Sequence, residues 1–366
     1  MRELRGKGSP VRVQLLKSTD FAAWRAAHAC EPAASELPYG IEHLAGHELD
    51  LRWKDAPPGP RGSLVHRLDR RVPPFMQTLR SASAIAGSDV VLAMFESEGH
   101  FLAIVRALKA WPFTRPRLVV ISCWLAELLV KRYSPRRIAL LRRAYRHVDR
   151  LVFFSRNQAE IYQRVLGVPP ERLRFVPFGI DHRYFSPGPP EEVENFVLAV
   201  GRDLGRDWAT LFEAVAGTSL RVKLATRPSA LQGLAVPSNV EVLGQIGLRK
   251  YRDLTRKTGL VVVPCVPQAY PTGQTVLLES MAAARCCVVT GSPAMEDYLD
   301  PGTSALVVPP RDPAALRAAL LDAAGSPELR ARLGNRARQL VEERYNAPAM
   351  WGRVREILLE LCSEPR

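Results

Sequence analysis

The chain has 366 residues, of which 47% are apolar and 24% charged, so we expect two globular domains and exclude an intrinsically disordered protein. The net charge of +14 lies almost wholly in one half, because residues 1–190 contain 30 basic and 17 acidic residues while residues 191–366 contain 21 and 20. The six cysteines form no CxxC pair and no apolar stretch has membrane-spanning length, which predicts a cytoplasmic protein with reduced thiols and no zinc site.

Short apolar runs alternate with segments of helical periodicity along the whole chain, a pattern typical of βαβ units and parallel sheets. The strands predicted in the first half are Val11–Leu16, Val90–Met94, Leu118–Ile121, Leu151–Phe154 and Leu173–Val176. Those predicted in the second half are Phe196–Val200, Arg221–Ala225, Val240–Leu243, Leu260–Pro264, Cys286–Thr290 and Ala305–Val308. Helices are predicted at Trp208–Val215, Thr275–Ala284, Pro313–Ala324 and Ala347–Leu361.

A proline-rich, acidic segment that begins at Ser186 predicts a linker between the two halves. We therefore expect a first domain at residues 1–187, a second at 188–345, and a C-terminal helix at 346–366 that packs back toward the first domain.

The positive charge is densest between Lys131 and Arg150, where apolar residues recur at helical spacing. Arginines cover much of the remaining surface of this predicted helix, at positions 136, 137, 142, 143, 146 and 150. A basic amphipathic helix of this kind can bind a membrane with anionic lipids. Alternatively, its apolar stripe packs on the sheet and the arginines are merely solvated.

The sharpest local pattern runs from the strand predicted at 260–264 through a small polar loop into a helix. This order of elements places the N–H groups of Gly273, Gln274 and Thr275 at a helix N-terminus, a site suited to a diphosphate. Glu279 lies one turn further along, where its carboxylate can accept hydrogen bonds from ribose hydroxyls. Alternatively, Thr275 only caps the helix and Glu279 is a solvated helical acid.

A glycine turn flanked by arginines opens the second half of the chain. Gly201 allows close approach of the backbone, and Arg202 and Arg206 supply charge with a geometry that matches phosphate oxygens. The alternative is that Arg202 and Arg206 form surface ion pairs with their neighbours, Asp203 and Asp207, so that the charges within each pair cancel.

In the first half, His100 and Glu98 follow a predicted strand end, where a catalytic or acceptor-binding group is expected. A histidine in a loop is otherwise most often a surface residue.

Together these segments resemble the retaining glycosyltransferases of family 4, also described as glycosyl transferases group 1. The stretches that carry the resemblance begin at Val148-Asp-Arg-Leu-Val, Gly167-Val-Pro-Pro-Glu, Val200-Gly-Arg and Leu306-Val-Val-Pro-Pro. The resemblance implies an α/β protein of the GT-B fold, with two Rossmann-like, doubly wound parallel-sheet domains facing across a cleft. It also implies donor-binding roles in the second domain for Gly201, Arg202, Arg206, Thr272, Gly273, Gln274, Thr275 and Glu279.

The chain departs from the family pattern at several positions. Pro271 stands where typical members have the first of two paired glutamates, the one that contacts the transferred sugar, whereas Glu279 matches the second. The Gly273-Gln274-Thr275 loop is similar to that of a bacterial subset of the family. In the first domain, Lys17 follows the first strand in place of a glycine-rich loop, and Ser122-Cys123-Trp124 replaces a histidine.

The expected function is transfer of a sugar from a nucleoside diphosphate-sugar to an acceptor of the lipid-linked, cell-envelope or secondary-metabolite class. The resemblance implies retention at the anomeric carbon, and the arrangement demands neither a metal nor a cofactor. We expect a cytoplasmic enzyme, peripheral at the inner face of the cell membrane if the helix at 131–150 binds lipid. The alternatives are a sugar-nucleotide epimerase or hydrolase of the same fold, or a basic protein that binds nucleic acid without specificity.

Overall fold

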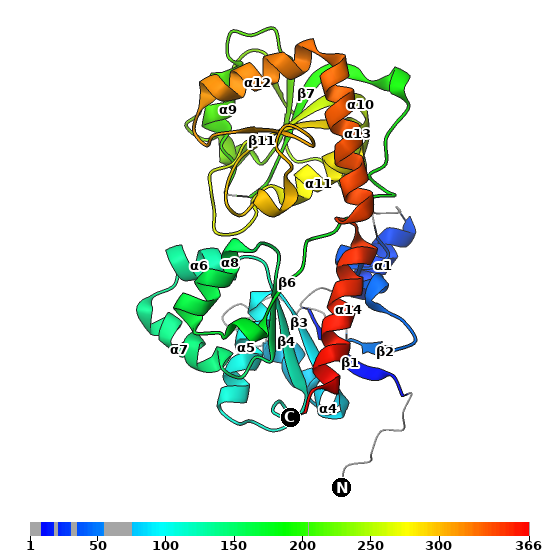
Figure 1. Ribbon diagram of the computed structural model, residues 1–366, viewed down its shortest axis with the longest axis vertical. Coiled ribbons are helices and arrows are strands. Elements are labelled where there is room, and N and C mark those ends of the chain that lie inside the picture. The colour runs from blue at the N-terminus through cyan, green and yellow to red at the C-terminus, as the bar shows by residue number, and fades with distance from the viewer. Residues whose placement is uncertain (1–8, 18–20, 31–34, 55–74, 204, 366) are drawn as a thin grey trace. The chain divides into compact units, whose positions relative to one another are not determined.

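The chain forms two compact units in the computed structural model, which describes residues 9–17, 21–30, 35–54, 75–203 and 205–365. The first unit comprises Met1–Val176 together with Met350–Arg366, and the second comprises Pro177–Ala349 (Figure 1). Each unit contains one six-stranded sheet with helices on its faces.

The first sheet is entirely parallel and has the strand order β2-β1-β3-β4-β5-β6. Its strands are buried apolar runs, as parallel strands covered on both faces require. The short edge strand β2 was not predicted from the sequence, because its four residues alternate between apolar and charged. The strands are β1 (Val11–Leu16), β2 (Leu49–Arg52), β3 (Val90–Met94), β4 (Arg117–Ser122), β5 (Arg150–Phe153) and β6 (Leu173–Phe175).

Most helices of the first unit connect consecutive strands, and α5 packs against α7. The last helix, α14, belongs mainly to this unit: its Trp351 Nε1 donates to the Tyr39 carbonyl at 2.8 Å and its Arg355 donates to the carbonyls of residues 43–45. The helical elements are α1 (Phe21–Cys30), η1 (Pro38–Leu44), α3 (Phe75–Arg80), α4 (Ala82–Gly87), α5 (Glu96–Ala107), α6 (Leu125–Lys131), α7 (Pro135–Tyr145), α8 (Asn157–Ile161), η2 (Tyr162–Leu166), η3 (Pro170–Arg172) and α14 (Ala347–Ser363).

The second sheet is also parallel throughout, with the order β12-β11-β10-β7-β8-β9. The predicted fold class, two doubly wound parallel sheets, is therefore confirmed. The strands are β7 (Glu194–Val200), β8 (Val222–Ala225), β9 (Val240–Val242), β10 (Thr258–Val263), β11 (Cys286–Thr290) and β12 (Leu306–Val308).

In the second unit, α9 packs against α12 and α11 packs against α13 (Figure 1). The helices begin at residues that favour an N-terminus: Asp207, Asp312 and Ser326 each accept a hydrogen bond from the first turn. The helical elements are η4 (Pro190–Glu192), α9 (Trp208–Val215), η5 (Pro228–Leu231), α10 (Leu248–Lys257), α11 (Gln274–Ala282), η6 (Glu296–Tyr298), α12 (Pro313–Gly325) and α13 (Pro327–Glu343).

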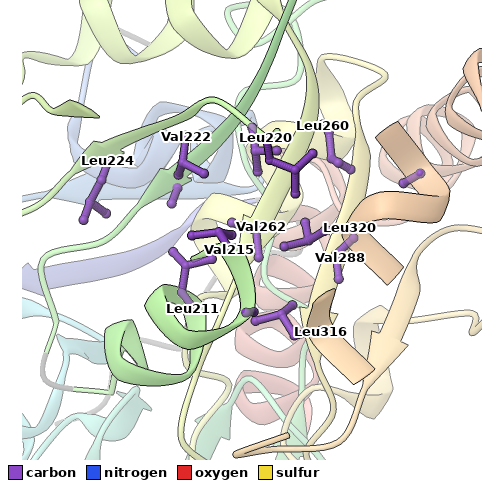
Figure 2. Packing of buried hydrophobic residues seen from close by; sticks show 14 of the residues in the cluster. Leu211, Val215, Leu220, Val222, Leu224, Leu260, Val262, Val288, Leu316 and Leu320 are labelled. Atoms are coloured by element: carbon purple, nitrogen blue, oxygen red, sulfur yellow. The ribbon is translucent and has the colours of Figure 1, made fainter. Parts of the chain in front are cut away.

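The core of the second unit lies between the sheet and the pair α9 and α12. Figure 2 shows side chains from both helices directed at the strands, with contributions from Leu211, Val215, Val222, Leu224, Leu260, Val262, Val288, Leu316 and Leu320. Burying one such side chain stabilises a fold by about 1.5–3 kcal/mol, and this packing holds the carboxyl ends of β7 and β10 in fixed positions.

The predicted basic helix exists as α7, with Leu141 and Tyr145 buried and Arg136 and Arg143 exposed. The prediction that Arg150 shares its exposed face is wrong. Arg150 lies in β5, is 7% exposed and forms an ion pair with Glu364. Its partner is more than two hundred residues away in the sequence, so helical spacing alone gave no sign of it.

Among the described residues, no helix combines the length and apolar character needed to cross a bilayer.

Candidate functional site

The second sheet changes its direction of growth between β7 and β10, and the predicted donor-binding residues gather at this point. From β7 the chain proceeds to β8 and β9 on one side, and from β10 to β11 and β12 on the other. Ligands of doubly wound folds bind at the carboxyl ends of the strands at such a switch point. The backbone segments that follow β7 and β10 pair with each other. Val266 N donates to Gly205 O at 2.9 Å, and the backbones of Arg206 and Cys265 form an isolated antiparallel β-bridge.

The Arg206 side chain packs directly against the Gly201 backbone at the end of β7. A Cβ atom at position 201 would lie 2.2 Å from Arg206 Nε, so only glycine lets the guanidinium pass. The Arg206 side chain is 3% exposed, and its Nε lies 3.3 Å from an Asp203 carboxylate oxygen. Its Nη1 lies 3.7 Å from the Cys265 sulfur, a weak acceptor.

The alternative of two adjacent surface pairs at this turn is wrong for Arg206. Its ionic partner is Asp203, whereas Asp207 caps α9 by accepting from Thr210 N at 3.2 Å and from Thr210 Oγ1 at 2.8 Å. Arg202 is exposed, and its charge lowers the pKa of Glu279. The structure thus brings both arginines toward the second predicted segment.

The N-terminus of α11 lies against the Arg206 side chain. Gly273 has a φ of 82°, and a Cβ there would lie 2.5 Å from Val263 Cγ1 and 3.0 Å from Arg206 Nη1. In the described part of the chain, the N–H groups of Thr275 and Val276 have no backbone acceptor. A helix N-terminus with open N–H groups beside a cation is suited to an anion.

Thr275 is exposed and does not cap α11, because the N-cap residue is Gly273 and has no side-chain cap. The capping alternative is therefore wrong. Thr272 and Gln274 are buried at 3% and 6% exposure, and Pro271 O accepts from Gln274 N at 3.3 Å.

Glu279 is buried at 9% exposure, which contradicts the alternative of a solvated helical acid. Burial raises the pKa of its carboxyl to about 8, against the lowering effects of the Tyr251 hydroxyl and of Arg202. Tyr251, on α10, was missed from the sequence because a tyrosine on an amphipathic helix gives no local sign of a partner on another helix.

Several buried side-chain atoms of the second unit have no hydrogen-bond partner in the described structure. They belong to residues that follow β7, β8 and β10: Trp208 Nε1, Thr226 Oγ1, Gln274 Nε2 and Arg206 Nε, whose contact with Asp203 is an ion pair. Such atoms are uncommon in native proteins. Of these atoms, Gln274 Nε2 lies at the start of α11, beside the predicted diphosphate site.

The predicted residues of the first unit lie at the start of α5. His100 is 9% exposed, with Nδ1 2.8 Å from the Tyr145 hydroxyl and Nε2 3.1 Å from the Tyr133 hydroxyl. Burial, together with the charge of Arg137, lowers the pKa of His100 to about 3, so the ring is neutral. For His100 to contact a substrate, one of its two hydrogen bonds to tyrosine hydroxyls must break. Its catalytic role therefore stays a prediction.

Glu98 is 1% exposed, accepts from Ser97 Oγ and acts electrostatically on Lys17. Its catalytic role likewise stays a prediction. The neighbouring Glu96 has a different place: its Oε1 accepts from Cys123 N at 2.6 Å, from Trp124 N and from Leu125 N at 2.7 Å. This buried carboxylate therefore caps α6.

No group of three or more His, Cys, Asp or Glu side chains is placed to hold a metal ion among the residues that the structure describes.

Comparison with known proteins relates both halves of the chain to glycosyltransferases. Residues 40–184 match the family described as Glycosyltransferase Family 4, and residues 197–325 match Glycosyl transferases group 1. A curated relative, the MMP alpha-(1->4)-mannosyltransferase of Mycolicibacterium hassiacum, is 26% identical over 250 residues, which cover 64% of this chain and 60% of that protein. The chain thus spans less than two thirds of that relative's length.

Solved structures show that the fold is GT-B. Sucrose-phosphate synthase from Thermosynechococcus elongatus has a TM-score of 0.73 and 17% identity, with 96% of this chain and 99% of that chain covered. Anabaena HepE in complex with UDP and glucose has a TM-score of 0.68 and 14% identity, with 96% and 100% covered. WaaG, a glycosyltransferase involved in lipopolysaccharide biosynthesis, has a TM-score of 0.61 and 16% identity, with 95% and 99% covered. Each half of this chain therefore matches a glycosyltransferase family model, and the fold is that of GT-B glycosyltransferases.

Proposed function

We propose that the protein uses these domains to transfer a sugar from a nucleoside diphosphate-sugar to an acceptor hydroxyl, with the donor held by the second unit. The observation that carries the proposal is the buried Arg206 guanidinium against the N-terminus of α11, where the first-turn N–H groups lack backbone acceptors and Gln274 Nε2 has no hydrogen-bond partner in the described structure. A similar structure, HepE, is described in complex with UDP and glucose, which supports a donor of this class.

The proposed roles follow the chemistry of each group. Arg202, Arg206 and the first turn of α11, Gly273 to Thr275, bind the diphosphate, because cations and open N–H groups both favour phosphate oxygens. Glu279 accepts hydrogen bonds from the ribose hydroxyls, and Thr272 lines the loop. Gln274 Nε2, which is buried and unpaired, donates to the sugar in place of the glutamate that is lost at Pro271.

In the proposed reaction the anomeric carbon loses its bond to the diphosphate and gains one to the acceptor oxygen, whose proton is released. Negative charge grows on the departing diphosphate, where the arginines and the helix N-terminus stabilise it. We propose that the configuration is retained, as in the family that the chain resembles, and that the charge is balanced by these residues without a metal. His100 and Glu98 remain candidates for the acceptor side in the first unit.

A peripheral location at an anionic membrane surface is part of the proposal. Helix α7 exposes Arg136, Arg137, Arg142 and Arg143, together with Leu140, which is 51% exposed, and its C-cap residue Arg146 is exposed as well. Basic residues near an anionic surface contribute about 1 kcal/mol each. The acceptor class that such a location favours is lipid-linked.

Product analysis tests the proposed reaction. The protein is incubated with labelled nucleoside diphosphate-sugars, with and without a panel of glycoside and lipid-linked acceptors. A new glycosidic bond that forms only when an acceptor is present supports transfer. An altered sugar nucleotide, or free sugar, formed equally without an acceptor would instead identify an epimerase or a hydrolase. Salt-dependent duplex binding with no nucleotide-sugar binding would point to a nucleic-acid-binding protein.

A further inference from the structure

The first sheet has its own switch point, between β1 and β3, and a row of aromatic rings lies there. Phe95 follows β3, and its ring centroid is 5.3 Å from that of Tyr39 and 6.2 Å from that of Trp124. The two outer rings are open to solvent, with Tyr39 47% and Trp124 50% exposed. We call these three side chains, Tyr39, Phe95 and Trp124, the aromatic row.

A buried cation lies beneath the aromatic row. Lys17, directly after β1, is 6% exposed, and its Nζ lies 4.9 Å from the Tyr39 ring centroid and 4.5 Å from that of Phe95. Glu98, which is 1% exposed, acts on this lysine with the opposite charge. Charged groups are seldom buried to this degree unless they are paired, and buried charge pairs are a common feature of functional sites.

The backbone is strained at two of the three rings. Tyr39 has a φ of 62° and Phe95 a φ of 76°, values that bulky side chains adopt only when the surrounding structure enforces them. Residues held in this way cluster at functional sites. The strain does not serve core packing at Tyr39, because that side chain is half exposed.

Buried polar groups hold both exposed rings in place. The Tyr39 carbonyl accepts from Trp351 Nε1 of α14 at 2.8 Å, and the Trp124 N–H donates to Glu96 Oε1. Each anchor lies far from its ring in the sequence, so the fold is arranged to present these two rings at this edge of the sheet.

We infer that the aromatic row is the acceptor site and that it takes a pyranose ring, stacked on Trp124 and bordered by Tyr39, whose ring stands at 81° to that of Phe95. A sugar ring has one face of C–H bonds, which packs against an aromatic ring, and a rim of hydroxyls, which stays in water or meets the polar edge of the site. In this arrangement Glu96 is a positioning residue that acts through Trp124. The inference rests on the proposed function, since a sugar acceptor is needed only by a transferase.

The test measures binding of methyl pyranosides, of the gluco, manno and galacto configurations, by saturation-transfer NMR and titration. We expect millimolar binding of at least one by the wild-type protein. Trp124→Ala and Tyr39→Ala each weaken it about tenfold or more, the factor that corresponds to one aromatic contact. Trp124→Phe, which keeps a ring, remains within about threefold of wild type. The matched control is Trp111→Ala, because Trp111 is 79% exposed elsewhere in the same unit.

Pyranoside binding that is unchanged in both alanine variants, or reduced equally by Trp111→Ala, would overturn the inference. Binding of a long-chain alkyl pyranoside without binding of any methyl pyranoside would also overturn it, because the aromatic row would then bind a lipid chain and not the sugar. Binding of both the methyl and the alkyl pyranosides supports a site that recognises the sugar ring, whether the sugar is free or lipid-linked. Nucleoside diphosphate binding is measured on the same variants and is expected to be unchanged, so failure of the donor assignment is detected separately.

Discussion

Arg206 lies across Gly201, so that its Nε atom is 2.2 Å from the point where any larger residue would place a Cβ. We therefore expect Gly201→Ala to displace the guanidinium and to weaken nucleoside diphosphate binding at least about tenfold, the factor of about 1.4 kcal/mol lost from a charged contact. The matched control is Gly325→Ala, since a Cβ there meets nothing within 4 Å. Equal binding by both variants in isothermal titration would contradict this relationship.

Arg206→Ala removes the buried cation itself. Hydrogen bonds to charged groups contribute about 1.5–3 kcal/mol, so we expect a loss of roughly 10- to 150-fold in nucleoside diphosphate affinity. Arg206→Lys restores the charge without the fork of donors and recovers only part of this loss. Arg332→Ala, which removes an exposed arginine of the same unit, serves as the control and leaves the affinity unchanged. Equal affinity of the Arg206→Ala variant and that control would show that Arg206 does not bind the diphosphate.

The raised pKa of the buried Glu279 carboxyl predicts that the stability of the protein depends on pH. Its pKa is raised to about 8 in the folded protein, above its ordinary value of 4.5, so between these pH values the folded state holds a proton that the unfolded state has released. The free energy of unfolding therefore falls as pH rises through this window. Glu279→Gln lacks this slope, and the variant gains stability relative to wild type as the pH approaches about 8. Parallel pH profiles of urea unfolding for the two proteins would refute the assignment.

Tyr251 provides a second measurement on the same group. Its hydroxyl lowers the pKa of Glu279, so Tyr251→Phe moves the midpoint of the Glu279 titration to higher pH. Carbon-detected NMR of the Glu279 carboxyl follows this midpoint directly. A midpoint that stays in place, or moves to lower pH, would show that the two side chains do not interact in solution.

Helix α7 predicts salt-dependent binding to anionic vesicles. Replacement of Arg136, Arg143 and Arg146 by glutamine removes three exposed charges, each of which contributes about 1 kcal/mol, so partitioning falls by roughly a hundredfold. Sedimentation with phosphatidylserine vesicles measures the change. The control neutralises three exposed basic residues of the second unit, Arg249, Lys250 and Arg332. Equal binding to neutral vesicles, or an equal loss in the control, would exclude α7 as the contact.

Much of the fold could be predicted because buried parallel strands and helix starts leave local patterns. Strand β11 and helix α9 have the predicted bounds, since each is a dense apolar segment bordered by polar residues. Strand β2 was missed because its alternation of leucine with charge suits an exposed edge as well as a loop. Helix α7 ends at Tyr145, earlier than the charge pattern suggests, and β5 takes Arg150 into the interior.

The residues of the proposed donor site come from two short segments, after β7 and after β10, which the sequence patterns singled out. Gly201 and Gly273 are explained by the approach of Arg206, a contact across the sheet that neither segment shows alone. The aromatic row could not be predicted, because Tyr39, Phe95 and Trp124 are distant in sequence and are aligned by buried anchors on other elements.

The most direct test of the central claim, a nucleoside diphosphate site in the second unit, is a thermal-unfolding screen of the intact chain. The screen covers the common nucleoside diphosphates and their sugars. Ligand at about 100 times its dissociation constant stabilises the folded state by about 2.7 kcal/mol, which raises the midpoint by several degrees. We expect at least one nucleotide to raise the midpoint and Arg206→Ala to remove the shift. A screen in which no nucleotide moves the midpoint, or in which the shift persists unchanged in Arg206→Ala, would contradict this claim.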